Sequence, residues 1–252
     1  MDSQFINLEL LANDFRQQNG LNLTEAIRIK SLLQKLNILT VYLPLSNDFS
    51  GMAVKLVSNE NTKRFLLINC NHTIGRQHFT ICHELYHLYY QIDFKSEKSN
   101  AGTFNKSGNP EEYKADIFAS FLLLPTNGVL QLIPEKERVK NKITLKTILA
   151  IEHYYSCSRN ALLNRLYNMK LIDRGKIDEN NKDIIKNATL YGYNTDLYQP
   201  GNEGMIIGDY GSLARELFDL GIISESSYFT LLEDIGIDLS QLDHLNTNEQ
   251  VC

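Results

Sequence analysis

The sequence lacks any paired-cysteine motif. Its four cysteines are scattered along 252 residues and form no CxxC pair: Cys70, Cys82, Cys157 and Cys252. This spacing argues against a disulfide framework and against a zinc site built from thiolates. The pattern favours a reducing compartment, and we expect a cytoplasmic protein.

Long apolar runs and an excess of basic residues are also missing. No uncharged apolar run reaches the roughly 18 residues that a membrane span needs, and residues 1–4 contain no basic region typical of a signal peptide. The net charge of −5 argues against sequence-independent binding of nucleic-acid phosphates, which depends on many Lys and Arg contacts. We therefore expect no membrane partner and no direct DNA binding.

Hydrophobic patterning predicts an α+β fold. Asn22 stands three residues before Glu25, the spacing of a capping box, and apolar residues follow at helical intervals as far as Leu36. Three short stretches rich in β-forming residues predict a small antiparallel sheet: 38–43, 51–57 and 64–70. Two further helices are predicted at 74–91 and 110–124, separated by a polar loop at 95–108.

A metal-binding motif lies within the first of these two helices. His83 and His87 are four residues apart, so both imidazoles lie on one helix face and can occupy two corners of a tetrahedral Zn²⁺ site. Glu84 adjoins the first histidine and is placed to polarise a bound water, as in the zincin pattern. We predict that His83 and His87 bind the metal and that Glu84 is the catalytic base.

A catalytic zinc needs a third protein ligand while one position stays open. Glu111 and Glu112 both stand in the first turn of the second helix, which Asn109 is predicted to cap. Either carboxylate could bind the metal, although acids in a first turn are also favoured by the helix dipole alone. Asp116, one turn after Glu112, can accept a hydrogen bond from a ligand histidine and fix its tautomer.

Together the two blocks resemble the ImmA/IrrE family of zinc metallopeptidases, a gluzincin-like arrangement of HExxH with a downstream glutamate. The matching positions are Arg76, Phe79, Thr80, His83, Glu84, Leu85, His87, Glu112, Ala115, Asp116, Phe118, Ala119, Leu122, Leu123, Leu124 and Pro125. The resemblance selects Glu112 over Glu111, because only Glu112 has the ExxAD spacing. Cys82 and Tyr86 depart from it, since the family usually has the smaller Ala and Gly there.

The resemblance implies a zincin-like fold and an endopeptidase that binds one Zn²⁺ per chain through His83, His87 and Glu112. It also implies a substrate, a helix-turn-helix repressor of a mobile element or stress regulon encoded nearby. The alternative is a non-catalytic zinc-binding regulator that binds a repressor or DNA. Glu84 argues against this alternative, because a scaffold without chemistry has no physical need for a base beside the metal.

The chain is predicted to have three parts: a zincin-like domain at 1–130, a helix-turn-helix-like segment at 131–172, and a polar linker with a helical C-terminal region at 173–252. Helical patterns at 144–155 and 158–169 form the second part. Its basic residues Arg159, Arg165 and Lys170 are too few for a strong basic stripe, so packing or partner docking is expected. His72 and His78 are expected to be surface or packing residues.

Overall fold

The computed structural model describes residues 3–58, 61–92, 94, 96–99, 101–104 and 109–237. Its strands are β1 (Leu39–Leu43), β2 (Gly51–Val57), β3 (Thr62–Asn69), β4 (Ser96–Ser99) and β5 (Ile206–Ile207). Its α-helices are α1 (Ser3–Gln18), α2 (Ile29–Lys35), α3 (Ile74–Tyr89), α4 (Pro110–Leu123), α5 (Thr126–Leu132), α6 (Leu145–Tyr155), α7 (Arg159–Asn168), α8 (Arg174–Asn180), α9 (Ile184–Leu190), α10 (Tyr210–Asp219) and α11 (Glu225–Asp234). The predicted α+β class is confirmed.

The sheet is mixed, whereas the sequence predicted an antiparallel one. Its strand order is β4-β2-β3-β1-β5, with β2 antiparallel to β3 and β1 parallel to β3. The chain reverses between β1 and β2 and again in the hairpin of β2 and β3, so β3 runs in the same direction as β1. Because β1 pairs with the free edge of β3 and not with β2, the pair is parallel. Which edge of β3 the strand β1 pairs with depends on residues far apart in the sequence, so the hydrophobic pattern within each strand does not predict it.

Two strands were not predicted. β4 lies in the segment expected to be a polar loop, and it pairs antiparallel with β2 from Gly51↔Ser99 to Val54↔Ser96. β5 has only two residues and pairs with β1. Neither strand has an alternating apolar pattern, so hydrogen bonding to a neighbouring strand defines both of them.

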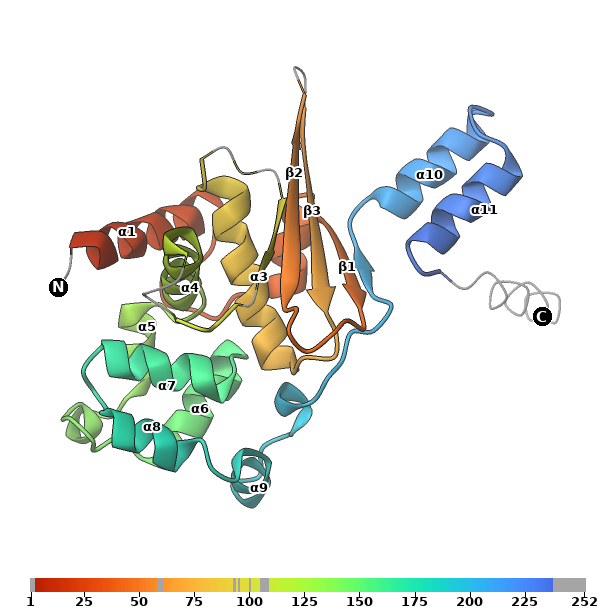
Figure 1. Cartoon of the computed structure of the whole chain (residues 1–252). Helices are drawn as coiled ribbons and strands as arrows, with labels where there is room; N and C mark the ends of the chain where they lie inside the picture. Colours follow the sequence, from red (N-terminus) through yellow and green to blue (C-terminus); the bar gives the residue numbers. More distant parts are fainter. Residues whose placement is uncertain are drawn as a thin grey trace.

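Helices cover one face of the sheet in layers (Figure 1). α3 packs against β2 and β3, α4 packs against α3, and α1 packs against α4. The sequence analysis did not predict α1, which buries Leu8, Ala12 and Phe15 at intervals of about one helical turn. These layers place α3, with its histidines, between the sheet and α4.

The predicted helix beginning near Asn22 was wrong in its start, because α2 begins only at Ile29. The Asn22 side chain instead accepts hydrogen bonds from the backbone N–H groups of Thr24 (2.8 Å) and Glu25 (3.3 Å). The buried Arg16 guanidinium donates to the carbonyl groups of Asn22 and Glu25. These bonds hold residues 22–25 in a bend before α2 begins.

The two predicted helices of the helix-turn-helix-like segment are present as α6 and α7. Thr144 and Ser158 cap them through their side chains, which accept from the backbone N–H groups three residues later. Both arginines of α7 are buried: Arg159 forms an ion pair with Glu152 (2.5 Å), and Arg165 donates to the carbonyl of Leu124 (3.0 Å). These side chains are therefore used in packing.

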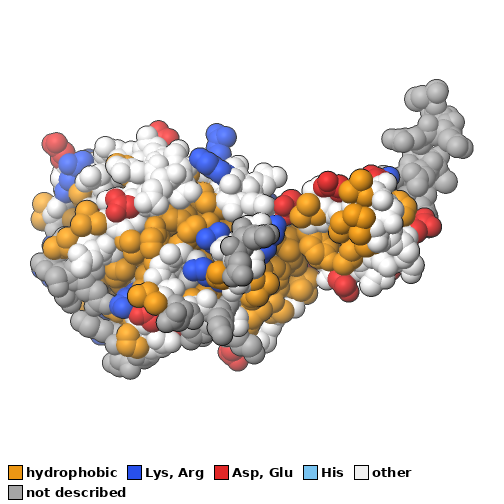
Figure 2. Space-filling model, turned by 90° about the horizontal axis from the view of Figure 1, so that it is seen from above, with side chains coloured by type: hydrophobic (Ala, Val, Ile, Leu, Met, Phe, Trp, Pro, Cys, Tyr) orange, Lys and Arg blue, Asp and Glu red, His pale blue; other side chains and the backbone are white. Residues whose placement is uncertain are grey.

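The segment expected to be a polar linker, 173–204, contains α8, α9 and a 3₁₀ turn, Asp196–Tyr198. It returns to the sheet, where β5 adds to β1. After β5, α10 and α11 form a hairpin that stands out from the body (Figures 1 and 2). The predicted helical block 210–242 covers this hairpin, but its last five residues lie outside the described residues.

One core cluster includes residues from both sides of the predicted boundary at 130/131, from Leu8 through Leu123 to Leu166. The three-part division therefore stays a prediction. Within the described residues, no single helix is long and apolar enough to cross a membrane. In the same part of the chain, α4 and α5 pass this test together, as a pair bent by 48°.

Candidate metal centre

His83 and His87 converge with Glu112 across the interface of α3 and α4. The Nε2 atoms of the two imidazoles are 3.1 Å apart. Glu112 reaches both of them, with Oε2 3.2 Å from His83 Nε2 and Oε1 3.1 Å from His87 Nε2. Tetrahedral ligands with zinc bonds of 2.0–2.1 Å stand about 3.3 Å apart. These spacings therefore match those of three ligands on one ion.

The bonding of these groups also fits a cation. Glu112 Oε1 is buried and has no hydrogen-bond partner among the described residues, although His87 Nε2 lies 3.1 Å away. An oxygen and a nitrogen that lie close together without forming an aligned hydrogen bond are typical of two ligands that point at the same metal position. One ligand atom each from His83, His87 and Glu112 lies within 4.8 Å of the others, so the three can hold a metal ion.

The local fold explains how Glu112 comes to this position. The Asn109 side chain accepts from the backbone N–H of Glu111 (2.9 Å) and Pro110 occupies the first helical position, as predicted for the start of α4. This start places Glu112 in the first turn, facing α3. Asp116 follows one turn later on the same face.

The alternative ligand, Glu111, points elsewhere. Its Oε2 accepts from the Tyr86 hydroxyl (2.9 Å), and its Oε1 lies 2.6 Å from Lys114 Nζ. Burial tends to raise the pKa of Glu111, but the bonds from Lys114 and Tyr86 outweigh it and lower the pKa. The buried Tyr86 thus has a hydrogen-bond partner in Glu111.

Asp116 hydrogen-bonds to Nδ1 of His83, the ring nitrogen that faces away from the metal position. Its Oδ1 accepts from His83 Nδ1 (2.8 Å) and from the backbone N–H of Gly102 (2.7 Å), and its Oδ2 accepts from the backbone N–H of Phe104 (2.7 Å). The bond leaves Nε2 of His83 directed at the metal position. Gln91 lies one turn after His87, and its Oε1 contacts His87 Nδ1. It therefore orients His87 as Asp116 orients His83.

The charges of the metal-free site are strongly coupled. Burial acts to lower the pKa of His83, but hydrogen bonds to Asp116 and Glu112 outweigh burial and raise this pKa to about 10. For Glu112, burial acts to raise the pKa, but the hydrogen bond to His83 and the nearby imidazole of His87 lower it to about 2. Without a metal, therefore, a proton on His83 supplies the positive charge that the carboxylates require.

Glu84 lies next to this cluster and is fully buried. Its Oε1 accepts from the Ser99 hydroxyl of β4, whereas its Oε2 has no hydrogen-bond partner among the described residues. Burial raises the pKa of Glu84, against the opposing effects of His83 and His87. A carboxylate with one oxygen held and the other open can accept a proton in a defined direction.

A glycine in β2 leaves room for this carboxylate. A Cβ atom on Gly51 would lie 2.7 Å from Thr80 Cγ2, 3.1 Å from the Leu67 carbonyl oxygen and 3.4 Å from Glu84 Oε1. The strand and α3 therefore approach more closely than any other residue at this position permits. Gly51 and Ser99 together form the wall of the site that the sheet contributes.

The two other histidines near the motif are placed apart from the cluster. His72 Nε2 lies 3.2 Å from the Asn47 carbonyl oxygen, and His78 Nδ1 lies 2.8 Å from the Ser156 carbonyl oxygen. Both contacts join segments of the fold.

Sequence reasoning missed several contributors: Gly51, Gln91, Ser99 and the backbone N–H groups of Gly102 and Phe104. Gln91 could have been found, because it is one helical turn from His87. Ser99 and Gly51 carry no local signal, since pairing between β2 and β4 brings them to Glu84.

A comparison with protein families agrees with this site. The model of a peptidase family described as the IrrE N-terminal-like domain matches residues 33–167, which is more than half of the chain. The matched range contains α3, α4 and the three convergent ligands. No curated protein gives a significant match.

Proposed function

The chain belongs to the metallopeptidase family that has the IrrE N-terminal-like domain, and we propose that it is a zinc-dependent endopeptidase. The observation that carries this proposal is the convergence of His83, His87 and Glu112 beside a buried carboxylate, Glu84. Two imidazoles and one carboxylate suit Zn²⁺ better than Mg²⁺ or Ca²⁺, which favour shells made of oxygen. One such ion would be held per chain.

When bound, zinc supplies Lewis-acid chemistry that polarises a peptide carbonyl and lowers the pKa of water. The residues of the chain supply the proton transfers. Glu84 Oε2 accepts the proton of the attacking water and later delivers it to the leaving amine, while the Ser99 hydroxyl holds Oε1. Asp116 keeps Nε2 of His83 directed at the metal through its bond to Nδ1.

For the substrate, we propose a helix-turn-helix repressor encoded near this protein. The support is the resemblance to the ImmA/IrrE family and the presence of the helices α5 to α8 after Pro125. Because Arg159 and Arg165 are buried in packing contacts, α7 is better suited to support or docking than to binding DNA phosphates.

The substitution Glu84→Gln tests the mechanism. The amide has nearly the same volume but cannot accept a proton, so hydrolysis should fall by a factor of about 100 to 10,000 while fold and zinc content persist. The measurements are elemental analysis, circular dichroism and cleavage of the neighbouring repressor. His83→Ala is the matched control, because it should lose both metal and activity.

The results separate the candidate functions. Discrete repressor fragments that disappear with a chelator and with Glu84→Gln support the endopeptidase. Zinc binding with an intact repressor, in a stable complex with this protein, would favour the non-catalytic regulator. Efficient degradation of casein with no cut in the repressor would leave a general peptidase.

A further inference from the structure

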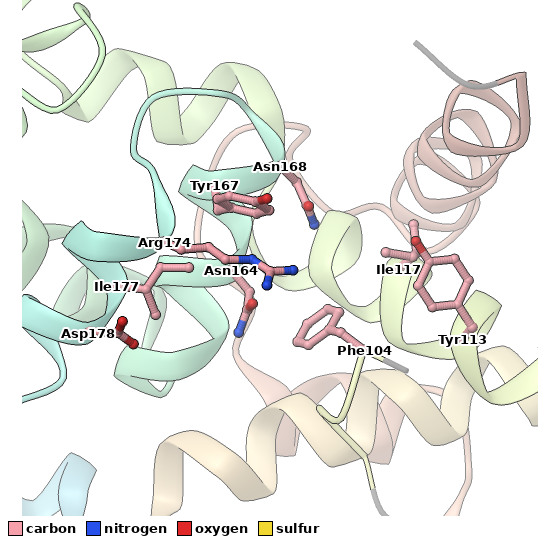
Figure 3. A pocket seen from close by; sticks show the side chains of 9 residues that line it. All are labelled: Phe104, Tyr113, Ile117, Asn164, Tyr167, Asn168, Arg174, Ile177 and Asp178. Carbon is pink, nitrogen blue, oxygen red and sulfur yellow. The ribbon is translucent and has the colours of Figure 1, made fainter. Parts of the chain in front are cut away.

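A cavity of about 460 Å³ lies between α4 and the helices α7 and α8. Figure 3 shows its wall of aromatic, amide and charged side chains, which come from segments far apart in the sequence. The lining residues are Phe104, Tyr113, Ile117, Asn164, Tyr167, Asn168, Arg174, Ile177 and Asp178. Its size is in the range of about 300–1,000 Å³ that is usual for ligand sites.

Arg174 is the cation of this cavity. Its guanidinium extends from the start of α8 toward the space between Phe104 and Asn168 (Figure 3). It forms no hydrogen bond or ion pair with any described residue. Arg174 is exposed, so its guanidinium stands at the solvent-facing side of the cavity with its donors free. A planar guanidinium is well suited to binding a carboxylate through two parallel hydrogen bonds.

The acidic residue of the cavity does not neutralise this arginine. Asp178 stands one turn after Arg174 on α8, yet the two form no ion pair within 4.0 Å. In Figure 3, Asp178 lies beyond Ile177, away from the guanidinium. Arg174 therefore gives the cavity wall a positive charge that Asp178 does not neutralise through an ion pair.

The cavity adjoins the metal centre. Tyr113 and Ile117 directly follow Glu112 and Asp116 on α4, so the cavity and the metal lie on neighbouring faces of one helix, about 100° apart. Phe104 connects the two sites, because its backbone N–H donates to Asp116 (2.7 Å) while its ring lines the cavity. Phe104 has a φ of 49°, which is unusual for a bulky side chain and is held here by that bond.

We propose that this cavity is a substrate subsite that binds an acidic side chain through Arg174. A helix is about 10 Å across, so two sites on neighbouring faces of α4 lie on the order of 10 Å apart. An extended peptide spans that distance with about three residues at 3.3 Å each. The subsite thus selects Asp or Glu about three positions from the cleaved bond. This inference rests on the proposed peptidase function.

The experiment measures binding, so that it does not depend on turnover. A library of randomised peptides is incubated with full-length, zinc-loaded Glu84→Gln protein, and the bound peptides are sequenced. Asp and Glu should be enriched about tenfold at one position, the effect of one charge-assisted contact. Arg174→Gln should remove the enrichment, and Arg174→Glu should replace it with enrichment of Lys and Arg.

Lys176→Gln is the matched control, since Lys176 lies on the same helix, pairs with Glu179 and does not line the cavity. It should leave the peptide profile unchanged. An unenriched profile, or acidic enrichment that survives Arg174→Glu, overturns the subsite. Incubating the recovered peptides with the wild-type protein separates the two proposals: enriched acidic peptides that stay whole refute the peptidase function and not the subsite, whereas peptides cleaved without acidic preference refute the subsite alone.

Discussion

At the scale of single residues, the site depends on which oxygen of each carboxylate is engaged. Glu84 has one oxygen bound by Ser99 and one without a partner, whereas both oxygens of Asp116 accept backbone or imidazole donors. A saturated carboxylate orients its neighbours, and an unsaturated one is free to accept a proton. This difference distinguishes the two acids more clearly than burial does, because both are buried.

Ser99→Ala tests the role of the bound oxygen. Without the hydroxyl, Glu84 Oε1 is a buried acceptor with no donor, and the direction of Oε2 is no longer fixed. Turnover should fall about tenfold, because a hydrogen bond to a charged group contributes about 1.5–3 kcal/mol and 1.4 kcal/mol corresponds to a tenfold rate change. Zinc content and KM should not change.

Ser99→Thr is the control, because it retains a hydroxyl and should retain most of the activity. Equal turnover in Ser99→Ala and the wild type would show that Ser99 has no positioning role. The measurement is kcat and KM on one purified substrate with all three proteins.

The protonation of His83 predicts how metal binding depends on pH. Its pKa in the metal-free protein is about 10, so below pH 10 an incoming ion must displace a proton from His83. Zinc affinity should therefore rise with pH between 6 and 9, by about tenfold per unit for one proton released. Glu112 does not contribute to this slope, because its pKa of about 2 lies far below this range.

Competition with a chromophoric chelator at several pH values measures this slope. Asp116→Asn should weaken zinc binding about ten- to hundredfold, because it removes the charge that orients His83. An affinity that does not vary with pH would contradict the proton displacement.

At the scale of elements, the site is an interface of two helices and a strand. α3 supplies His83, Glu84 and His87, α4 supplies Glu112, and β4 supplies Ser99 through its pairing with β2. Close packing of β2 on α3 sets the distance between Ser99 and Glu84. The pairing of β4 with β2 therefore brings Ser99 to Glu84.

Gly51→Ala tests this close packing. The added Cβ would lie 2.7 Å from Thr80 Cγ2 and 3.1 Å from the backbone oxygen of Leu67, so β2 and α3 must separate. We expect a loss of about 1–3 kcal/mol in the free energy of unfolding. Gly211→Ala is the control, because nothing lies within 4 Å of a Cβ there and Ala favours a helix. Urea denaturation measures both, and equal stabilities would refute the crowding.

At the scale of the whole molecule, the chain after α7 has one segment that is bonded to the body at several points and one that has few contacts with it. Residues 196–207 are bound to it: the Tyr198 hydroxyl contacts Glu152, the Ile74 N–H donates to the Gln199 carbonyl, and β5 pairs with β1. The hairpin of α10 and α11 is joined to it by the hydrogen bond from Asn37 to Asp209, and a groove lined by both apolar and charged side chains lies between α10 and the sheet. Figure 2 shows hydrophobic side chains on both sides of this junction.

Two truncations should therefore behave differently. Ending the chain after Gly208 keeps β5, and the zinc content should be unchanged with a Tm shift below about 5 °C, because one exposed hydrogen bond contributes only about 1 kcal/mol. Ending it after Thr195 removes several bonds to the body and should lower stability by about 3 kcal/mol or more. Calorimetry and elemental analysis measure both, and equal Tm values would contradict this distinction.

Local spacing along the chain was sufficient for the helices of the site. An apolar period of 3.6 and capping residues such as Asn109 predicted α3 and α4, and the four-residue spacing of His83 and His87 predicted that they share one face. These properties depend only on neighbours within a few turns, so the sequence alone determines them.

The tertiary structure decided what depends on distant segments. Three features join residues that are far apart along the chain and follow no repeating pattern. They are the parallel pairing of β1 with β3, the approach of Ser99 to Glu84, and the cavity wall formed by Arg174 and Phe104. Such contacts follow from sheet register and from the order in which layers pack, and local patterning does not specify either of them. The sequence therefore determined which groups can bind a metal, whereas packing decided which groups surround them.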